Sequence, residues 1–271
     1  MSVLLAGNGE PVVFAHSYLW DAEMWRPQID ALAADFRVVV PELWGHGRSG
    51  EMPGGTLSIR SLAQQHLQLF DHLGLERFTL VGLSVGAMWA AELALMAPQR
   101  VRGLVLMDSF LGPEPVERHR QFSAMLDMVE ASGTATQQLA DALAPFFLSR
   151  HSMEKQPLLL RRFRNSILDL DSAQIVRSIV PLGRMIFGRR DALSDLADLQ
   201  MPSLVMTGSD DLSRPPEEGR MMAQMIGCPF VEIPSAGHIA SLEQPAFVNS
   251  QLQGFLRSVH TFTADQPMAR R

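Results

Sequence analysis

The chain has 271 residues, of which 46% are hydrophobic, and its 23 basic and 29 acidic side chains give a formal net charge of −6. This composition is typical of a globular protein with a sizeable core, and it argues against a nucleic-acid-binding surface, which needs a basic face. The single cysteine, Cys228, excludes an internal disulfide bond and a four-cysteine zinc site, and the sequence has no His-Glu-x-x-His motif.

Nothing in the sequence indicates a targeting or membrane segment. The first ten residues, MSVLLAGNGE, lack the basic region and the long apolar run of a signal peptide. No stretch approaches the roughly 18 consecutive apolar residues that a membrane-spanning helix needs. We therefore expect a cytoplasmic protein that binds neither nucleic acid nor membrane. No feature of the sequence fixes its oligomeric state.

Short apolar runs alternate with amphipathic segments along the chain. The runs predict strands at residues 3–6, 11–16, 37–41, 78–83, 101–107, 203–207 and 229–233. The amphipathic segments predict helices at residues 24–34, 58–73, 87–97, 216–226 and 244–259. Nearly continuous Val, Leu and Ile runs are typical of strands buried on both faces. The alternation predicts an α/β fold with a doubly wound, mostly parallel sheet.

Residues 111–199 break this alternation. They contain no strand-like run, and their many Leu, Met and Phe residues recur at helical spacing. We predict a helical insertion here, between a core made of residues 1–110 and 200–262. The polar segment 263–271 is expected to be a frayed tail.

One motif carries recognisable chemistry. Residues 82–86 read Gly-Leu-Ser-Val-Gly, between a predicted strand and a predicted helix. Gly-x-Ser-x-Gly in this context predicts a sharp, strained turn that lifts the hydroxyl of Ser84 clear of the sheet, where it can act as a nucleophile.

Such a serine needs a base to take its proton. His238 lies in a small-residue loop after the last predicted strand, at the same edge of the sheet as Ser84. His16 and His46 lie in turns near this edge, and we interpret them as hydrogen-bonded turn residues. We interpret His66, on the helix predicted at 58–73, as a surface residue.

The base in turn needs a carboxylate that holds its tautomer. Asp210 and Asp211 follow the strand predicted at 203–207, and Asp108 follows the strand predicted at 101–107. All three are candidates. With Asp211 as the acid, the chain order is Ser84, Asp211, His238, which is the order found in α/β-hydrolases.

These residues belong to a set of motifs in a familiar order. The strand predicted at 11–16 ends in His16-Ser17, and residues 41–49 read Pro-Glu-Leu-Trp-Gly-His-Gly-Arg-Ser. Two further motifs comprise Gly208, Asp211 and Pro215, and Gly237, His238, Glu243, Pro245 and Phe247. The sequence thereby resembles the α/β-hydrolase superfamily along nearly its whole length, and within it small bacterial esterases and enol-lactonases. It departs from the usual pattern at Ser17, which replaces a glycine, and at Glu42, which replaces an aspartate.

The resemblance implies roles for further residues. It favours Asp211 as the acid, and it assigns the oxyanion hole to the backbone N–H groups of Val85 and Tyr18. It also implies that the insertion is a cap over the active site. Candidate pocket residues, for which ordinary core packing is the alternative, are Met125, Phe146 and Phe147 in the insertion and Trp20, Trp44 and Ile239 near the motifs.

We therefore expect a serine hydrolase that cleaves a small carboxylic ester or lactone through an acyl-enzyme. The partner is a small-molecule substrate, and neither a cofactor nor a metal is implied. The same residues in relatives also serve hydrolysis of a carbon–carbon bond or peroxide-dependent acyl chemistry. A third alternative, of another class, is a small-molecule receptor built on the hydrolase fold with little turnover.

Overall fold

The computed structural model describes residues 1–261, and for residues 260 and 261 it describes the backbone alone. The segment expected to be frayed, 263–271, lies outside the described residues. Seven strands form one sheet in the order β1-β3-β2-β4-β5-β6-β7, in which β1 alone is antiparallel. The strands are β1 (Val3–Ala6), β2 (Glu10–Ala15), β3 (Phe36–Pro41), β4 (Phe78–Leu83), β5 (Val101–Met107), β6 (Ser203–Gly208) and β7 (Phe230–Ile233).

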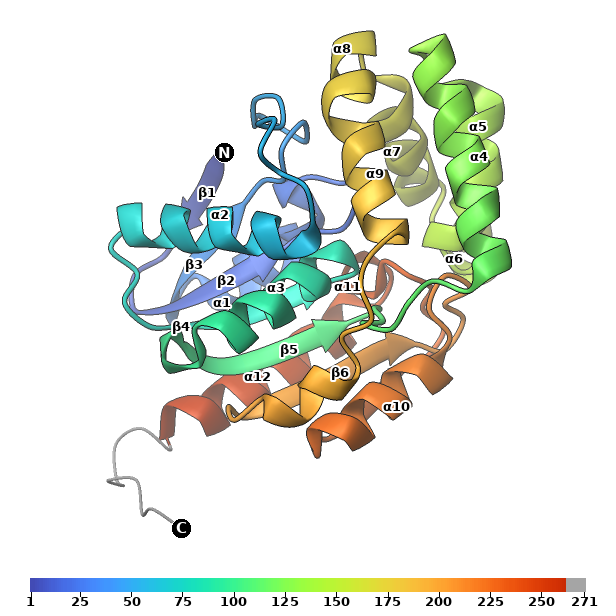
Figure 1. Ribbon diagram of the computed structural model, residues 1–271. Coiled ribbons are helices and arrows are strands. Elements are labelled where there is room, and N and C mark those ends of the chain that lie inside the picture. The colour runs from blue at the N-terminus through green and yellow to red at the C-terminus, as the bar shows by residue number, and fades with distance from the viewer. Residues whose placement is uncertain (262–271) are drawn as a thin grey trace.

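Helices cover both faces of the sheet, as Figure 1 shows. The core helices are α1 (Arg26–Leu32), α2 (Ile59–His72), α3 (Val85–Met96), α10 (Pro216–Ile226), α11 (Ala240–Glu243) and α12 (Pro245–Thr261). Helices α2 and α3 pack together on one face, α1 and α12 pack together on the other, and α10 packs on β6 and β7. The predicted doubly wound, mostly parallel α/β sheet is therefore confirmed.

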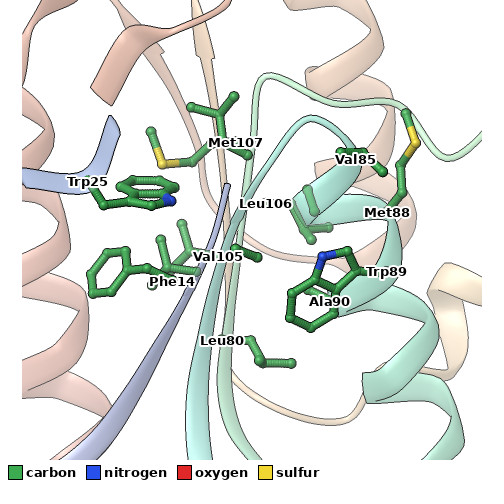
Figure 2. Packing of buried hydrophobic residues seen from close by; sticks show 14 of the residues in the cluster. Phe14, Trp25, Leu80, Val85, Met88, Trp89, Ala90, Val105, Leu106 and Met107 are labelled. Atoms are coloured by element: carbon green, nitrogen blue, oxygen red, sulfur yellow. The ribbon is translucent and has the colours of Figure 1, made fainter. Parts of the chain in front are cut away.

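The central strands are buried on both faces, which explains their nearly continuous apolar sequence. Every residue of β4 is buried, and so is nearly all of β5. Figure 2 shows Phe14 and Trp25 on one side of the sheet and Trp89 on the other. The rings of Phe14 and Trp25 pack with centroids 5.0 Å apart.

Between β5 and β6 the chain forms helices and no strand. They are α4 (Val116–Ser132), α5 (Gln137–Phe147), α6 (Arg150–Lys155), α7 (Pro157–Leu168), α8 (Ser172–Gln174), a π-helix (Ile175–Ile179) and α9 (Val180–Phe187), followed by a 3₁₀ turn (Ser194–Asp198). This helical insertion stands beyond the carboxyl ends of the strands (Figure 1). Catalytic loops of open α/β sheets lie at the same edge.

Two local expectations are corrected. The helix expected at residues 24–34 is a 3₁₀ turn, Ala22–Trp25, followed by α1, whose start is marked by Pro27. The surface position expected for His66 is wrong, because this side chain is 0% exposed. Its ring stacks on Trp89 with centroids 3.8 Å apart, and its Nδ1 lies 2.8 Å from the carbonyl oxygen of Leu62. The face of α2 that carries His66 is therefore buried by packing against α3, which the spacing of apolar residues in the sequence did not indicate.

Candidate active site

The turn between β4 and α3 holds Ser84 in an unusual backbone conformation. Its φ is +58° and its ψ is −122°, a backbone conformation that residues other than glycine rarely adopt. The backbone is fixed by a hydrogen bond from Ser84 N–H to the carbonyl oxygen of Met107, 3.0 Å, and the Ser84 carbonyl oxygen accepts from Ser109 Oγ, 2.9 Å. The Ser84 hydroxyl does not cap α3, so it remains available for chemistry.

The two glycines of the motif are required by space. A Cβ atom at Gly82 would lie 2.6 Å from backbone atoms of Ala87, and a Cβ atom at Gly86 would lie 2.2 Å from the backbone oxygen of Ala15. Strand β4, helix α3 and strand β2 thus meet at a distance that only glycine permits. This close packing holds the strained turn.

His238 and Asp211 meet as a hydrogen-bonded pair. The Nδ1 atom of His238 lies 2.8 Å from Asp211 Oδ2, and both side chains are buried. The other carboxylate oxygen, Asp211 Oδ1, accepts from the backbone N–H groups of Ser213 and Arg214 at 2.8 and 3.0 Å. The carboxylate is therefore oriented from both sides. An imidazole that donates from Nδ1 keeps Nε2 free to accept a proton.

The two other candidate acids lie elsewhere. Asp210 is exposed, and its backbone N–H donates to the carbonyl oxygen of Ala236. Asp108 is fully buried, and its Oδ1 accepts from the backbone N–H of Gly208 at 2.7 Å. Burial and the nearby Asp211 carboxylate raise the pKa of Asp108 well above its usual range. Neither Asp108 nor Asp210 has a hydrogen bond to His238 among the described residues.

Two histidines brace the loop that carries Tyr18. The backbone N–H of Leu43 donates to His16 Nε2 at 2.9 Å, and the N–H of Leu19 donates to His46 Nε2 at 3.2 Å. Both Nε2 atoms are therefore acceptors, so the proton of each ring is on Nδ1, where it donates to a carbonyl oxygen. Burial lowers the pKa of His16 to about 4 and that of His46 to about 3, so both rings stay neutral.

Two backbone N–H groups, one on this loop and one next to Ser84 in the chain, have no acceptor within residues 1–259. The N–H of Tyr18 donates no hydrogen bond within residues 1–259, whereas its neighbour Leu19 is held by His46. Val85 is the first residue of α3, so its N–H has no acceptor within the helix. The Tyr18 hydroxyl donates to the carbonyl oxygen of Ile179 in the π-helix, 2.8 Å, and so ties this loop to the insertion.

Ser84 and His238 open into one cavity beneath the insertion. It contains about 930 Å³ of empty space, open solvent at its mouth included. Among the described lining residues, the polar side chains are those of Tyr18, Ser84, Ser213, Arg214 and His238. The other lining side chains are apolar, and most come from the insertion, including Phe122, Met125, Leu143, Phe146, Phe147 and Ile186.

Three of the six candidate pocket residues line this cavity, and three do not. Met125, Phe146 and Phe147 line the cavity, and the Phe147 ring packs edge-on against His238 with centroids 5.7 Å apart. Trp20, Trp44 and Ile239 do not line it. Trp20 stacks on Phe163, Trp44 donates to Gln65, and Ile239 is fully buried. Proximity to a motif in sequence places a residue at the rim, whereas its side-chain direction depends on packing.

Sequence reasoning missed Arg214, which lines the cavity and lies three residues after Asp211. Its guanidinium pairs with the buried Glu114, which also binds Arg189 at 2.8 Å. This cluster joins the loop after β6 to both ends of the insertion. In the sequence Arg214 lies in a polar, charged stretch, which does not reveal a partner 100 residues away.

In the part of the chain that the structure describes, no group of three His, Cys, Asp or Glu side chains is placed to hold a metal ion. Nor does any helix in that part have the length and apolar character required to cross a bilayer.

Comparisons with known proteins identify the family of this chain. Residues 10–245 match the family described as alpha/beta hydrolase fold. The chain is 26% identical over 261 residues to 3-oxoadipate enol-lactonase 1 of Acinetobacter baylyi. The aligned region covers 96% of this chain and 94% of the relative.

Two solved structures are similar over nearly the whole chain. A thermophilic esterase from Thermogutta terrifontis has a TM-score of 0.86 and 31% identity, covering 96% of this chain and 93% of that one. An enol-lactonase from Burkholderia xenovorans has a TM-score of 0.84 and 26% identity, covering 94% and 96%. The chain therefore belongs to the alpha/beta-hydrolase fold family and is a hydrolase.

Proposed function

We propose that this hydrolase cleaves a small carboxylic ester or lactone through an acyl-enzyme on Ser84. His238 takes the proton of the Ser84 hydroxyl as it attacks the carbonyl carbon, and then gives the proton to the leaving alcohol. Asp211 orients His238 and stabilises its cation. Water, activated by the same histidine, then hydrolyses the acyl-enzyme. The reaction needs no cofactor, and its partner is a small-molecule substrate.

The negative oxygen of the tetrahedral intermediate needs donors that are in place beforehand. We assign this role to the backbone N–H groups of Tyr18 and Val85. The His46 contact to Leu19 supports the assignment, because it fixes the loop on which Tyr18 lies. The esterase and enol-lactonases among the similar proteins support the substrate class.

One observation carries the proposal. Ser84 holds a strained backbone conformation and lines the same cavity as His238, whose Nδ1 is hydrogen bonded to Asp211. A strained residue persists only where the surrounding structure enforces it, and such residues cluster at functional sites.

A labelling experiment tests the nucleophile. A fluorophosphonate probe should label the wild-type protein and fail to label Ser84→Ala, whose kcat on p-nitrophenyl esters should fall on the order of 10⁶-fold. Ser241→Ala is a control, because Ser241 is also buried but does not line the cavity. Labelling that survives in Ser84→Ala would contradict the proposal. Labelling without sustained turnover of any ester, lactone or diketo acid would instead favour a receptor.

A further inference from the structure

The cavity extends from Ser84 into a separate hydrophobic cluster inside the insertion. This satellite cluster has Leu126, Ile175 and Val180 at its centre, with Val129, Leu170 and Phe187 packed against them. Every one of these residues lines the cavity that also contains Ser84 and His238. Leu126, Ile175 and Val180 are buried apart from the main core, whereas Leu170 and Phe187 pack against both clusters.

An apolar void of this kind needs an explanation. Protein interiors are close-packed, and an empty space lined by apolar side chains lowers stability because its walls lose contacts. Water gains little there, since it finds few hydrogen-bond partners. An apolar ligand group would restore the missing contacts. The satellite cluster therefore has the properties of a binding surface for hydrocarbon.

The position of His238 indicates which part of an ester lies there. The leaving oxygen must face His238, which returns a proton to it, so the acyl substituent points away from that ring. His238 packs against Phe147 of α5. The satellite cluster lies beside Tyr18 instead, because Tyr18 bonds to Ile179, which directly precedes Val180. The acyl group is the part directed toward the cluster.

Charge narrows the substrate class further. Arg214 is the one lysine or arginine among the described lining residues, and its guanidinium is already paired with the buried Glu114. A carboxylate at the far end of the acyl chain would be buried among apolar side chains without a free cation, which is strongly unfavourable.

From these observations we infer that the substrate is an ester of an uncharged, apolar acid of medium chain length, whose hydrocarbon chain fills the satellite cluster. The inference rests on the proposed function for the reaction, whereas the evidence for the apolar binding surface is the lining of the cavity. It separates this chain from a hydrolase that prefers short or carboxylate-bearing acyl groups.

Turnover of matched esters gives the first test. Along the p-nitrophenyl series from acetate to octanoate, kcat/KM should rise about threefold or more for each added methylene. Mono-p-nitrophenyl suberate has the same chain length as the octanoate but ends in a carboxylate, and its kcat/KM should be at least 100-fold lower. A flat series, or a preference for the suberate, would overturn the inference.

A pair of variants tests where the hydrocarbon chain of the substrate binds. Ala135 packs against the satellite cluster and lines the cavity, whereas Ala131 is exposed on α4. Ala135→Phe should lower kcat/KM for the octanoate at least tenfold more than kcat/KM for the acetate. Ala131→Phe should change neither. An equal loss on both esters in Ala135→Phe, or the same selective loss in Ala131→Phe, would contradict the assigned position.

A binding experiment separates this inference from the proposed reaction. Octanamide should bind the Ser84→Ala variant with a negative heat-capacity change measured by calorimetry, and suberamate and acetamide should bind at least tenfold more weakly. If no ester is turned over but octanamide binds in this way, the proposed function fails and the apolar site stands. If esters are turned over but octanamide binds no better than suberamate, the site assignment fails and the function stands.

Discussion

At the scale of single residues, the site contains three aspartates with different surroundings. Asp211 accepts hydrogen bonds from two backbone N–H groups and from His238 Nδ1–H. Asp108 lies beside it, buried and with a raised pKa. Asp210 is solvent-exposed. Neighbouring carboxylates thus differ in role because their hydrogen-bond donors and burial differ.

This assignment predicts unequal effects of three isosteric changes. Asp211→Asn should lower kcat about 10⁴-fold, because an amide no longer favours the tautomer of His238 that can accept a proton. Asp108→Asn should lose less than tenfold, since an amide oxygen can still accept from Gly208 N–H. The exposed Asp210→Asn is the control and should be unchanged. Steady-state kinetics on one ester suffices, and a larger loss in Asp108→Asn than in Asp211→Asn would reverse the assignment.

At the scale of elements, the strained turn at Ser84 depends on how closely β2, β4 and α3 approach. A Cβ atom at Gly86 would meet backbone atoms of Ala15, which cannot move away as a flexible side chain could. The insertion contributes in another way, since the hydrogen bond from Tyr18 to Ile179 joins it to the loop that carries Tyr18. The π-helix that contains Ile179 is of the kind that is frequent at functional sites.

Two glycine substitutions compare this packing with ordinary helix propensity. Gly86→Ala should lower the free energy of unfolding by about 3 kcal/mol, because its Cβ would overlap the Ala15 backbone. Gly254→Ala lies in the exposed face of α12 with nothing within 4 Å of the added atom, and should stabilise the protein by about 0.5–1 kcal/mol. Urea unfolding measures both. Equal effects would show that the close approach is not needed.

At the scale of the whole molecule, the core buries three neutral histidines. Burial lowers the pKa of His66 to about 4, similar to His16, and that of His46 to about 3. In the unfolded chain each titrates near 6.5. The unfolded state therefore binds more protons below that pH, so stability is complete above about pH 6.5 and falls as the pH is lowered toward 4.

A variant on α2 tests the contribution of His66 to the pH dependence of stability. The free energy of unfolding should fall steeply between pH 6.5 and 4, and His66→Phe should lower that slope by about 1.4 kcal/mol per pH unit. The replacement keeps an aromatic ring beside Trp89. His72→Asn, on the exposed face of the same helix, should leave the slope unchanged. A slope that is unaltered in His66→Phe would show that this histidine is not neutral when folded.

The sequence by itself determined the order of strands and helices, the α/β architecture and the strand-to-helix turn around Ser84. Those features depend on local patterns: apolar runs, glycine spacing and the residues that follow each strand. The strand predicted at 78–83 matches β4, and the first and last predicted strands differ from β1 and β7 by at most one residue.

Tertiary structure alone decided which side chains meet. His66 was expected at the surface and is buried, because α3 supplies a ring for it to stack on. Trp20, Trp44 and Ile239 lie near the motifs in sequence but do not line the cavity, whereas Met125 does. The satellite cluster joins residues from α4 to α9, and the cavity that it lines is a property of how helices pack. Periodicity reports that a face is apolar, but not whether another side chain or a ligand covers it.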